Sequence, residues 1–301
     1  MAGIGDDSAV IAPRDENLLL TTDMMVEGVH FDVSFVTPFQ LGFKILSVNV
    51  SDIYAMGGIP RHVLLDIALT KDADEGFIGA FFDGVRSGLE RYRLVLVGGD
   101  LSASRSGVVL SATLGGYAKK PVFRSGARPG DRIYVTGNLG DSACGLELLK
   151  RIKRPLMIES GDITHKPLKW ATMEPLVRRH LLPEARDPSS FAGRATSMID
   201  ISDGLFIDLS RICDESGVGA RIYMEQLPLS PQMKKAASVL GLEPYSLAAS
   251  GGEDYELLFT APPRKRVEAF CIGEITVSGR VVVERDRSER TFGREGYIHW
   301  H

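Results

Sequence analysis

The sequence carries, almost at its N-terminus, the stretch Gly3-Ile4-Gly5-Asp6-Asp7, in which two adjacent carboxylates follow two glycines. Adjacent acids repel each other, so a folded chain keeps them close only where water or a cation offsets the repulsion. Taken alone, the stretch fits a solvated turn as well as a divalent-metal site in a cleft. An apolar run that leads into a small residue and an acid then recurs at Thr21–Asp23, Asn49–Asp52, Gly98–Asp100, Asp200–Gly204 and Gly251–Asp254.

Length and composition set the class of protein. The chain has 301 residues, 44% hydrophobic and 25% charged, which is typical of a globular protein with two ordinary domains or one large one. A net charge of −4 argues against a broad nucleic-acid surface. No apolar run approaches the roughly 20 residues of a membrane span. The N-terminus also lacks the basic and then apolar pattern of a secretory signal.

The cysteines indicate a reducing compartment. Cys144, Cys213 and Cys271 lie far apart in the sequence, have no metal-binding spacing, and stand among apolar neighbours. We therefore expect three buried thiols and a cytoplasmic protein without a membrane or nucleic-acid partner.

The first part of the chain predicts an α+β unit. Strand-like apolar runs span 18–23, 63–69, 94–97 and 108–116, and apolar residues at helical spacing span 39–57 and 74–93. This order favours an antiparallel or mixed sheet with helices. Because the helix over 39–57 is mostly core, Asp52 needs a partner there and is a stronger metal candidate than a surface acid. A linker at Lys119–Pro121 divides the chain into domains 1–118 and 119–301.

The second part predicts an α/β domain. Strands are expected over 133–137, 198–201, 220–223 and 255–260, and helices over 140–149, 205–213 and 232–240. The strand at 198–201 delivers Ser202-Asp203-Gly204 to the start of a helix, where backbone N–H groups and a hydroxyl could hold an anion. The charged run Glu284–Arg290 is expected to be a solvated hairpin tip.

The repeated acids predict phosphoryl transfer with Mg²⁺. The chain has no Walker loop, no Rossmann fingerprint, no HExxH and no nucleophile elbow. Carboxylates at this density suit Mg²⁺, which completes its octahedron with water and phosphate oxygens. Arg124 and Arg128 fit either forked hydrogen bonds to phosphate or exposed linker charges. His30 fits either a partner for a substrate anion or an ordinary loop histidine.

Several longer motifs carry a family resemblance. They are Gly3–Asp7, Thr22-Asp23, Glu27–Phe31, Ser47–Ile53, Ala55–Gly57, Gly98–Asp100, Arg124–Ala127, Gly137–Ala143, Ile199–Leu205 and Ser250–Leu257. In this order, and over nearly the whole chain, the set resembles the thiamine-monophosphate kinase family. That family belongs to a superfamily with aminoimidazole ribonucleotide synthetase and selenophosphate synthetase.

The resemblance implies a fold and a reaction. The fold would be the two-domain aminoimidazole ribonucleotide synthetase-like fold, with an N-terminal mixed sheet that forms a homodimer and a C-terminal α/β domain. Domain 1–118 would bind metal and ATP, and domain 119–301 would bind the substrate and close over the nucleotide. The reaction would be ATP-dependent phosphorylation of thiamine phosphate to thiamine diphosphate. The γ-phosphoryl would pass directly with several Mg²⁺ ions, so no residue is singled out as a certain catalytic group.

The resemblance also assigns residues, motif by motif. It implies a metal set of Asp7, Thr21, Thr22, Asp23, Asp52, Asp100, Asp200 and Asp203. It implies nucleotide contacts from Gly99, Asp100, Arg124 and Ser202. It implies thiamine phosphate contacts from His30, Glu253 and Tyr297.

Three alternatives stay open at this point. The chain could be another ATP-dependent enzyme of the superfamily with a different phosphate acceptor. Selenophosphate synthetases carry a reactive Cys or selenocysteine near the N-terminus, however, whereas the first cysteine here is Cys144. It could be a non-catalytic nucleotide-binding paralogue, although a binding module has no need for so many acids. Glu253 could be one more metal ligand or a helix-end acid instead of a substrate contact.

Overall fold

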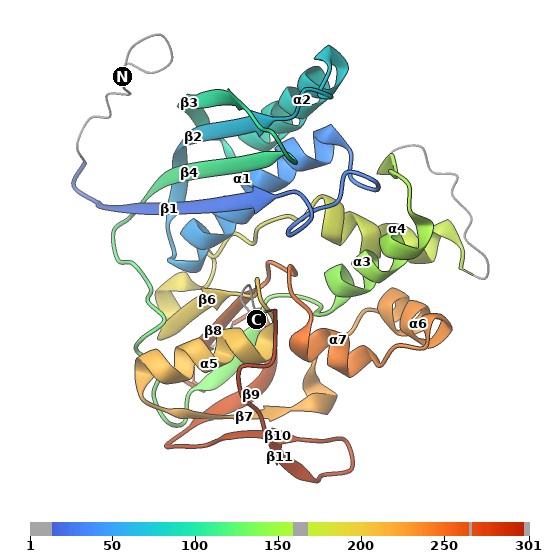
Figure 1. Cartoon of the computed structure of the whole chain (residues 1–301). Helices are drawn as coiled ribbons and strands as arrows, with labels where there is room; N and C mark the ends of the chain where they lie inside the picture. The colour runs from blue at the N-terminus through green and yellow to red at the C-terminus, as the bar shows by residue number, and fades with distance from the viewer. Residues whose placement is uncertain (1–13, 159–167, 265–266, 298–301) are drawn as a thin grey trace. The chain divides into compact units, whose positions relative to one another are not determined.

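The computed structural model describes residues 14–158, 168–264 and 267–297, which form two compact units (Figure 1). Unit 1 comprises the described residues up to Pro121 together with Ile152–Met157. Unit 2 comprises Val122–Arg151 and the described residues from Ile158 onward. The predicted metal ligand Asp7 lies outside the described residues.

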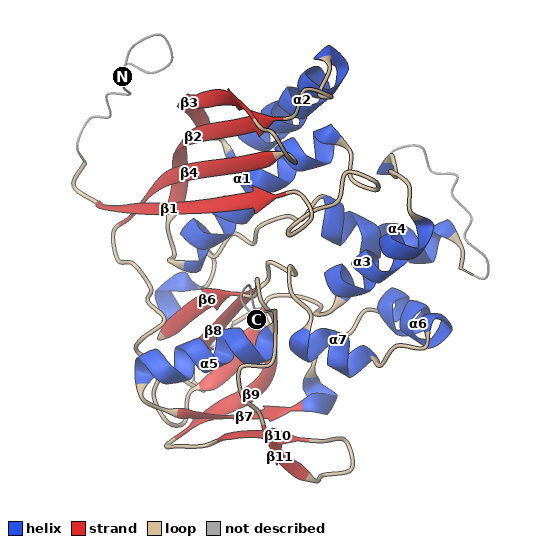
Figure 2. Cartoon of the chain, viewed as in Figure 1, coloured by secondary structure: helices blue, strands red, loops and turns tan. Residues whose placement is uncertain are grey.

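Unit 1 is a mixed sheet with two helices. Its elements are β1 (Asn17–Val26), α1 (Pro38–Ala55), β2 (Ile59–Leu69), α2 (Glu75–Tyr92), β3 (Val95–Ala103) and β4 (Val109–Ala118). The strand order is β1-β4-β2-β3, with β2 and β3 parallel and the β1–β4 and β2–β4 pairs antiparallel. Helix α1 packs on the sheet, and α2 packs on α1 (Figure 2). The mixed sheet predicted from the sequence is confirmed.

Helix α1 forms the centre of unit 1 and carries Asp52. A capping box fixes its start, because the Thr37 hydroxyl accepts a hydrogen bond from the Gln40 N–H and the Gln40 side chain accepts one from the Thr37 N–H. Pro38 occupies the first helical turn, where its missing N–H costs nothing. Most residues of the helix are buried, so tertiary packing holds it in place.

Strand β1 has two different faces. The side chains on its covered face are Leu19, Thr21, Asp23 and Met25. The side chains on its exposed face are Leu18, Leu20, Thr22 and Met24. Because both sets contain large apolar residues, burial of either face of the strand against another element or another chain would be favourable.

Two predicted strand ends are wrong. Pairing with β4 runs unbroken from Asn17 to Val26, so Thr21–Asp23 lies inside β1. Gly98–Asp100 likewise lies inside β3, where it pairs with β2. The polar residues do not end these strands, because the neighbouring strands continue to satisfy the backbone hydrogen-bonding groups.

Unit 2 is a larger mixed sheet with helices. Its strands are β5 (Arg132–Val135), β6 (Ser197–Asp200), β7 (Gly219–Tyr223), β8 (Leu257–Ala261), β9 (Phe270–Thr276), β10 (Arg280–Val283) and β11 (Glu289–Thr291). Its helices are α3 (Asp141–Ile152), α4 (Trp170–Leu181), α5 (Leu205–Ser216), α6 (Pro231–Leu240) and α7 (Pro244–Ser250), with short turns η2 (Ala192–Arg194) and η3 (Met224–Gln226). The strand order is β11-β10-β7-β9-β5-β8-β6, with β7 and β10 parallel. The charged run Glu284–Arg290 contains the turn of the β10–β11 hairpin and the start of β11, so the predicted hairpin tip is confirmed.

Three details complete the comparison with the sequence. Helix α7 was not predicted. Cys144 and Cys213 are buried, but the prediction of a buried thiol at Cys271 is wrong, because this residue stands near the start of β9, beside a shift in its register with β5. Across the described ranges, none of the helices combines the length and hydropathy that crossing a bilayer would need.

Candidate active site

In unit 1, the fold brings Thr21, Asp23 and Asp52 together at the contact of β1 with α1. The Thr21 hydroxyl donates a hydrogen bond to Asp52 Oδ2 at 2.5 Å. Burial, and after it the neighbouring Asp52 carboxylate, raises the pKa of Asp23 to about 7. Two half-buried carboxylates this close need a proton or a cation to offset their repulsion. The oxygen donors at this position therefore fit Mg²⁺.

Not all of the other predicted metal ligands lie beside Asp23 and Asp52. Thr22 lies on the other face of β1, where its hydroxyl donates to the Ala112 carbonyl at 3.1 Å and accepts from the Thr113 hydroxyl at 3.2 Å. Asp200 and Asp203 belong to unit 2. Among the residues that the structure describes, no three His, Cys, Asp or Glu side chains lie close enough to hold a metal ion together.

Gly99 occupies a position that only glycine fits. Its φ is +152°, and a Cβ there would lie 1.9 Å from the Leu65 carbonyl oxygen of β2. The next residue, Asp100, is exposed and pairs in register with Asp66, which is exposed as well. The Asp100 carboxylate accepts from the Leu101 N–H at 2.9 Å. This part of β3 therefore combines a side-chain-free backbone position at Gly99 with an exposed carboxylate at Asp100.

His30 has a defined tautomer. Its Nδ1 accepts a hydrogen bond from the Val26 N–H at 3.1 Å, so the neutral ring carries its hydrogen on Nε2. The neighbouring Glu27 carboxylate accepts from the Val108 N–H at 2.8 Å and fixes the same loop.

Arg124 stands on an ordered loop with its side chain exposed. The Ser216 hydroxyl at the end of α5 donates to the Arg124 carbonyl at 3.2 Å. The Ser216 hydroxyl oxygen also accepts from the N–H groups of Gly126 and Ala127, each at 3.2 Å. The loop backbone is therefore fixed. The exposed guanidinium remains compatible both with a phosphate contact and with an ordinary surface charge.

The Asp208 carboxylate occupies the backbone N–H groups of the loop before α5. Its Oδ2 accepts hydrogen bonds from the N–H groups of Ser202, Asp203 and Gly204 at 3.1–3.2 Å. Those donors are therefore occupied by this chain's own carboxylate and do not form the open anion site that the sequence predicted. Burial raises the pKa of Asp208 to about 6, and Arg211 opposes that rise while it pairs with both Asp208 and Asp203.

The loop from Gly251 to Glu256 lies against the segment Ile201–Gly204, which precedes α5. The Glu253 N–H donates to the Ser202 carbonyl at 2.7 Å, and the Tyr255 N–H donates to the Ile201 carbonyl at 2.9 Å. Gly252 is required for this approach, because a Cβ there would lie 2.6 Å from the Ser202 carbonyl oxygen. Glu253 itself has a φ of +62°, a left-handed conformation that is uncommon for residues other than glycine.

The three acids of this loop differ sharply in environment. Asp254 is fully buried and accepts from the backbone N–H groups of Gly140 and Ser142 at 2.6 and 3.2 Å, and burial raises its pKa to about 7. Glu256 is also fully buried and is held by the Thr136 hydroxyl at 2.5 Å and by two guanidinium groups, from Arg179 and Arg186. These two acids have structural partners.

Glu253 is the acid of the loop that remains partly open. Its side chain is 29% exposed, and its Oε2 lies 3.0 Å from His180 Nδ1. Tyr297, the predicted aromatic near the C-terminus, is 46% exposed and donates its N–H to the Asp203 carbonyl at 2.9 Å. The structure therefore brings Ser202, Asp203, Glu253 and Tyr297 to one region of unit 2.

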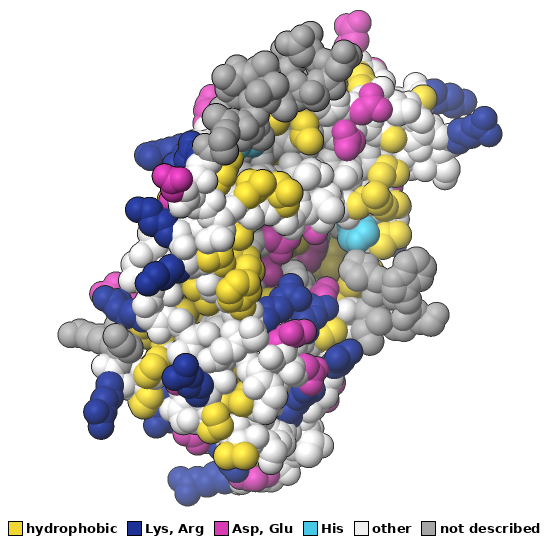
Figure 3. Space-filling model, turned by 90° about the vertical axis from the view of Figure 1, so that its left-hand side faces the viewer, with side chains coloured by type: hydrophobic (Ala, Val, Ile, Leu, Met, Phe, Trp, Pro, Cys, Tyr) yellow, Lys and Arg dark blue, Asp and Glu magenta, His cyan; other side chains and the backbone are white. Residues whose placement is uncertain are grey.

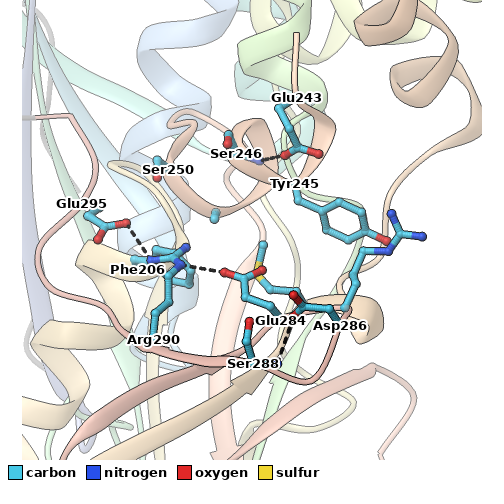
Figure 4. A pocket seen from close by; sticks show the side chains of 13 residues that line it. Phe206, Glu243, Tyr245, Ser246, Ser250, Glu284, Asp286, Ser288, Arg290 and Glu295 are labelled. Atoms are coloured by element: carbon cyan, nitrogen blue, oxygen red, sulfur yellow. Dashed lines mark hydrogen bonds and ion pairs between the residues drawn. The ribbon is translucent and has the colours of Figure 1, made fainter.

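A pocket of about 420 Å³ opens elsewhere on unit 2, beside α7 and the β10–β11 turn (Figure 4). Its carboxylates are Glu243, Glu284, Asp286 and Glu295. Arg290 pairs with two of them, and Arg285 lies over the Tyr245 ring at 5.4 Å. None of the metal, nucleotide or substrate contacts predicted from the sequence lines this pocket, and we assign it no part in the site.

Sequence reasoning missed the groups that hold the site in place. They are His180, Arg179, Arg186, Asp208 and Arg211. Asp208 had a local signal, because an acid in the first turn of a helix readily accepts from the backbone just before it. The basic residues Arg179 and Arg186 had no comparable signal, since their partner Glu256 lies 77 and 70 residues away in the sequence.

Comparisons with protein families describe both parts of the chain. Residues 5–118 match the N-terminal domain of AIR synthase related proteins, and residues 128–286 match the C-terminal domain of the same proteins.

Individual relatives are similar over nearly the whole chain. The thiamine-monophosphate kinase of Aquifex aeolicus is 40% identical over 92% of this chain and 86% of its own length. That of Salmonella typhimurium is 39% identical over 99% of this chain and 91% of its own length. Among solved structures, AaThiL complexed with AMPPCP and TMP is 36% identical with a TM-score of 0.83, and the match covers 99% of this chain and 92% of that one.

Proposed function

The chain belongs to the thiamine-monophosphate kinases, within the AIR synthase related proteins, and from that premise we propose that it phosphorylates thiamine phosphate to thiamine diphosphate with ATP. The pairing of AMPPCP with TMP in the AaThiL complex supports this choice of the two substrates. We propose direct transfer of the γ-phosphoryl group, so the protein's task is to hold two anionic substrates in line.

The half-buried Asp23 carboxylate beside Asp52 carries the proposal that Mg²⁺ takes part. Burial and the neighbouring Asp52 carboxylate raise the pKa of Asp23 and so disfavour its ionised form, which a bound cation would stabilise. When bound, Mg²⁺ would neutralise charge on the phosphates during transfer. We propose Thr21, Asp23 and Asp52 as one group of ligands, with Asp7, Thr22, Asp100, Asp200 and Asp203 completing the set for several ions.

We propose contacts to the substrates from backbone and side-chain groups that are at least partly exposed. We propose that the nucleotide lies against the bare backbone at Gly99 and contacts Asp100, Arg124 and Ser202. The Nε2–H of His30 would donate to the phosphate of the acceptor. Glu253 would complement the cationic thiazolium or the hydrogen-bonding edge of the pyrimidine, and Tyr297 would cover the ring system.

The two parts of the chain would divide this work. We propose that residues 1–118 bind metal and ATP and form the dimer, and that residues 119–301 bind thiamine phosphate and close over the nucleotide. The boundaries of the two compact units and of the two family matches support a division near residue 120.

An exposed apolar sheet face supports a homodimer. Large hydrophobic side chains lie on the face of the unit 1 sheet away from α1, and they are Leu18, Leu20, Met24, Ile59, Leu64 and Val95. Hydrophobic side chains are also visible at the surface of unit 1 in Figure 3. A second copy of the same face would cover these side chains in a two-fold interface.

We also propose a cytoplasmic location. Cys144 and Cys213 are buried free thiols, the state that cysteines keep in a reducing compartment.

The acceptor assignment is tested with Glu253→Gln. If Glu253 binds the acceptor, the KM for thiamine phosphate should rise about 10–150-fold, the equivalent of one lost charge-assisted hydrogen bond, while the KM for ATP and the Mg²⁺ requirement stay nearly constant. An equal rise in both KM values, or a shift in the Mg²⁺ optimum alone, would instead make Glu253 a metal ligand.

A further inference from the structure

We propose that His180 is a positioning residue for Glu253, and that it acts on acceptor binding through this carboxylate. The inference rests on the proposed function, because it concerns the group that we expect to contact thiamine phosphate.

The geometry comes from one turn of helix α4. His180 stands in the last turn of α4, is 4% exposed, and places its Nδ1 3.0 Å from Glu253 Oε2 and 3.1 Å from the Ser142 hydroxyl. The preceding residue, Arg179, binds Glu256 of the same loop. Two consecutive residues of α4 therefore hold two acids of the loop that carries Glu253.

The chemistry of the contact fixes the position of a proton. An ionised carboxylate only accepts hydrogen bonds, so the Nδ1 of His180 must carry a hydrogen that points toward Glu253. The hydroxyl of Ser142, at the start of α3, can accept from the same N–H and keeps the imidazole ring from turning. His180 is thus a fixed donor on a side chain that is nearly inaccessible to solvent.

Glu253 needs such a donor because its side chain is long and partly exposed. Its backbone is fixed by the left-handed φ and by the bond from its N–H to the Ser202 carbonyl, but these constraints leave the rotamers of the carboxylate undetermined. A carboxylate that recognises a ligand binds best when its rotamer is set before the ligand arrives. The His180 N–H sets that rotamer in the structure.

A pair of polar variants tests the assignment. His180→Asn places an amide N–H near the position of Nδ1, whereas His180→Gln places it near the position of Nε2 and removes the donor that faces Glu253. Steady-state kinetics should give a KM for thiamine phosphate about tenfold above wild type for His180→Gln and within about threefold for His180→Asn, with the KM for ATP and kcat nearly constant in both. Thermal melting of each variant confirms that it is folded, and should His180→Gln not fold, His180→Leu takes its place.

A double-mutant cycle separates positioning from a general structural role. In the Glu253→Gln background, His180→Gln should add less than about twofold to the KM for thiamine phosphate, because its partner has already changed. The inference is overturned if the two His180 variants have equal KM values, or if the cost of His180→Gln is the same in both backgrounds. A wild-type protein without thiamine phosphate-dependent turnover would instead overturn the proposed function.

Discussion

Glu253 and Glu256 stand three residues apart in one loop, and the structure places them in different environments that matched substitutions can distinguish. Glu256 is fully buried between the Thr136 hydroxyl and the guanidinium groups of Arg179 and Arg186. Removing one charge from a buried pair costs about 3–5 kcal/mol, because the other charge is left without its partner. Since the Arg186 side chain is 41% exposed and can turn toward water, we expect Glu256→Gln to lose the lower value, about 3 kcal/mol.

Thermal unfolding measures this loss. For a domain of this size, about 3 kcal/mol corresponds to a fall in Tm of about 6–12 °C. Glu253→Gln is the matched control, because the same chemical change at a side chain that is 29% exposed should move the Tm by less than about 2 °C while it raises the KM for thiamine phosphate. The reasoning is refuted if Glu256→Gln melts with the wild type, or if Glu253→Gln is the less stable of the two variants.

Three further predictions follow from the site, the sheet and the buried acids. Asp52→Asn should lower Mg²⁺-dependent turnover by orders of magnitude while circular dichroism stays unchanged, and full activity at ordinary Mg²⁺ would remove Asp52 from the metal set. Leu20→Glu combined with Met24→Glu should convert a dimer into a monomer in sedimentation, whereas Phe82→Glu on α2 should leave the dimer intact; a wild-type monomer at micromolar concentration would contradict the interface. Because burial raises the pKa of Asp254 to about 7, the folded chain holds this proton more tightly than the unfolded chain, and the resulting stability is full below about pH 4 and lost as the pH rises through about 7. Urea unfolding should therefore show a weaker pH dependence over this window in Asp254→Asn, and an unchanged dependence would contradict the assignment.

The sequence predicted the elements that carry strong periodicity. Helix α1 and its polar residue Asp52 were predicted because apolar positions at helical spacing leave few alternatives over eighteen residues. The succession of strands and helices along unit 1 and the helix that follows Ser202–Gly204 were also predicted, whereas the order of the strands within the sheet was not. The ends of β1 and β3 were not, because the signal for a strand end is local, whereas the pairing partner that continues the strand lies elsewhere in the chain.

The different environments of the neighbouring acids could not be predicted from the local sequence either. Glu253, Asp254 and Glu256 are all acids. In the folded chain they differ in burial and in the distant residues that they contact. Asp208 shows the same limit, since it fills the backbone donors that the sequence offered to an anion. Such assignments depend on contacts across long sequence separations, which a pattern of residues does not encode.

The most direct test of the account is the stoichiometry of one reaction. Purified wild-type protein with ATP, Mg²⁺ and thiamine phosphate should form ADP and thiamine diphosphate in equal amounts, and omission of either Mg²⁺ or thiamine phosphate should abolish both products. A panel of other phosphate acceptors, run in parallel, should give no comparable turnover. ADP release without thiamine diphosphate, or faster turnover with another acceptor, would contradict the central claim.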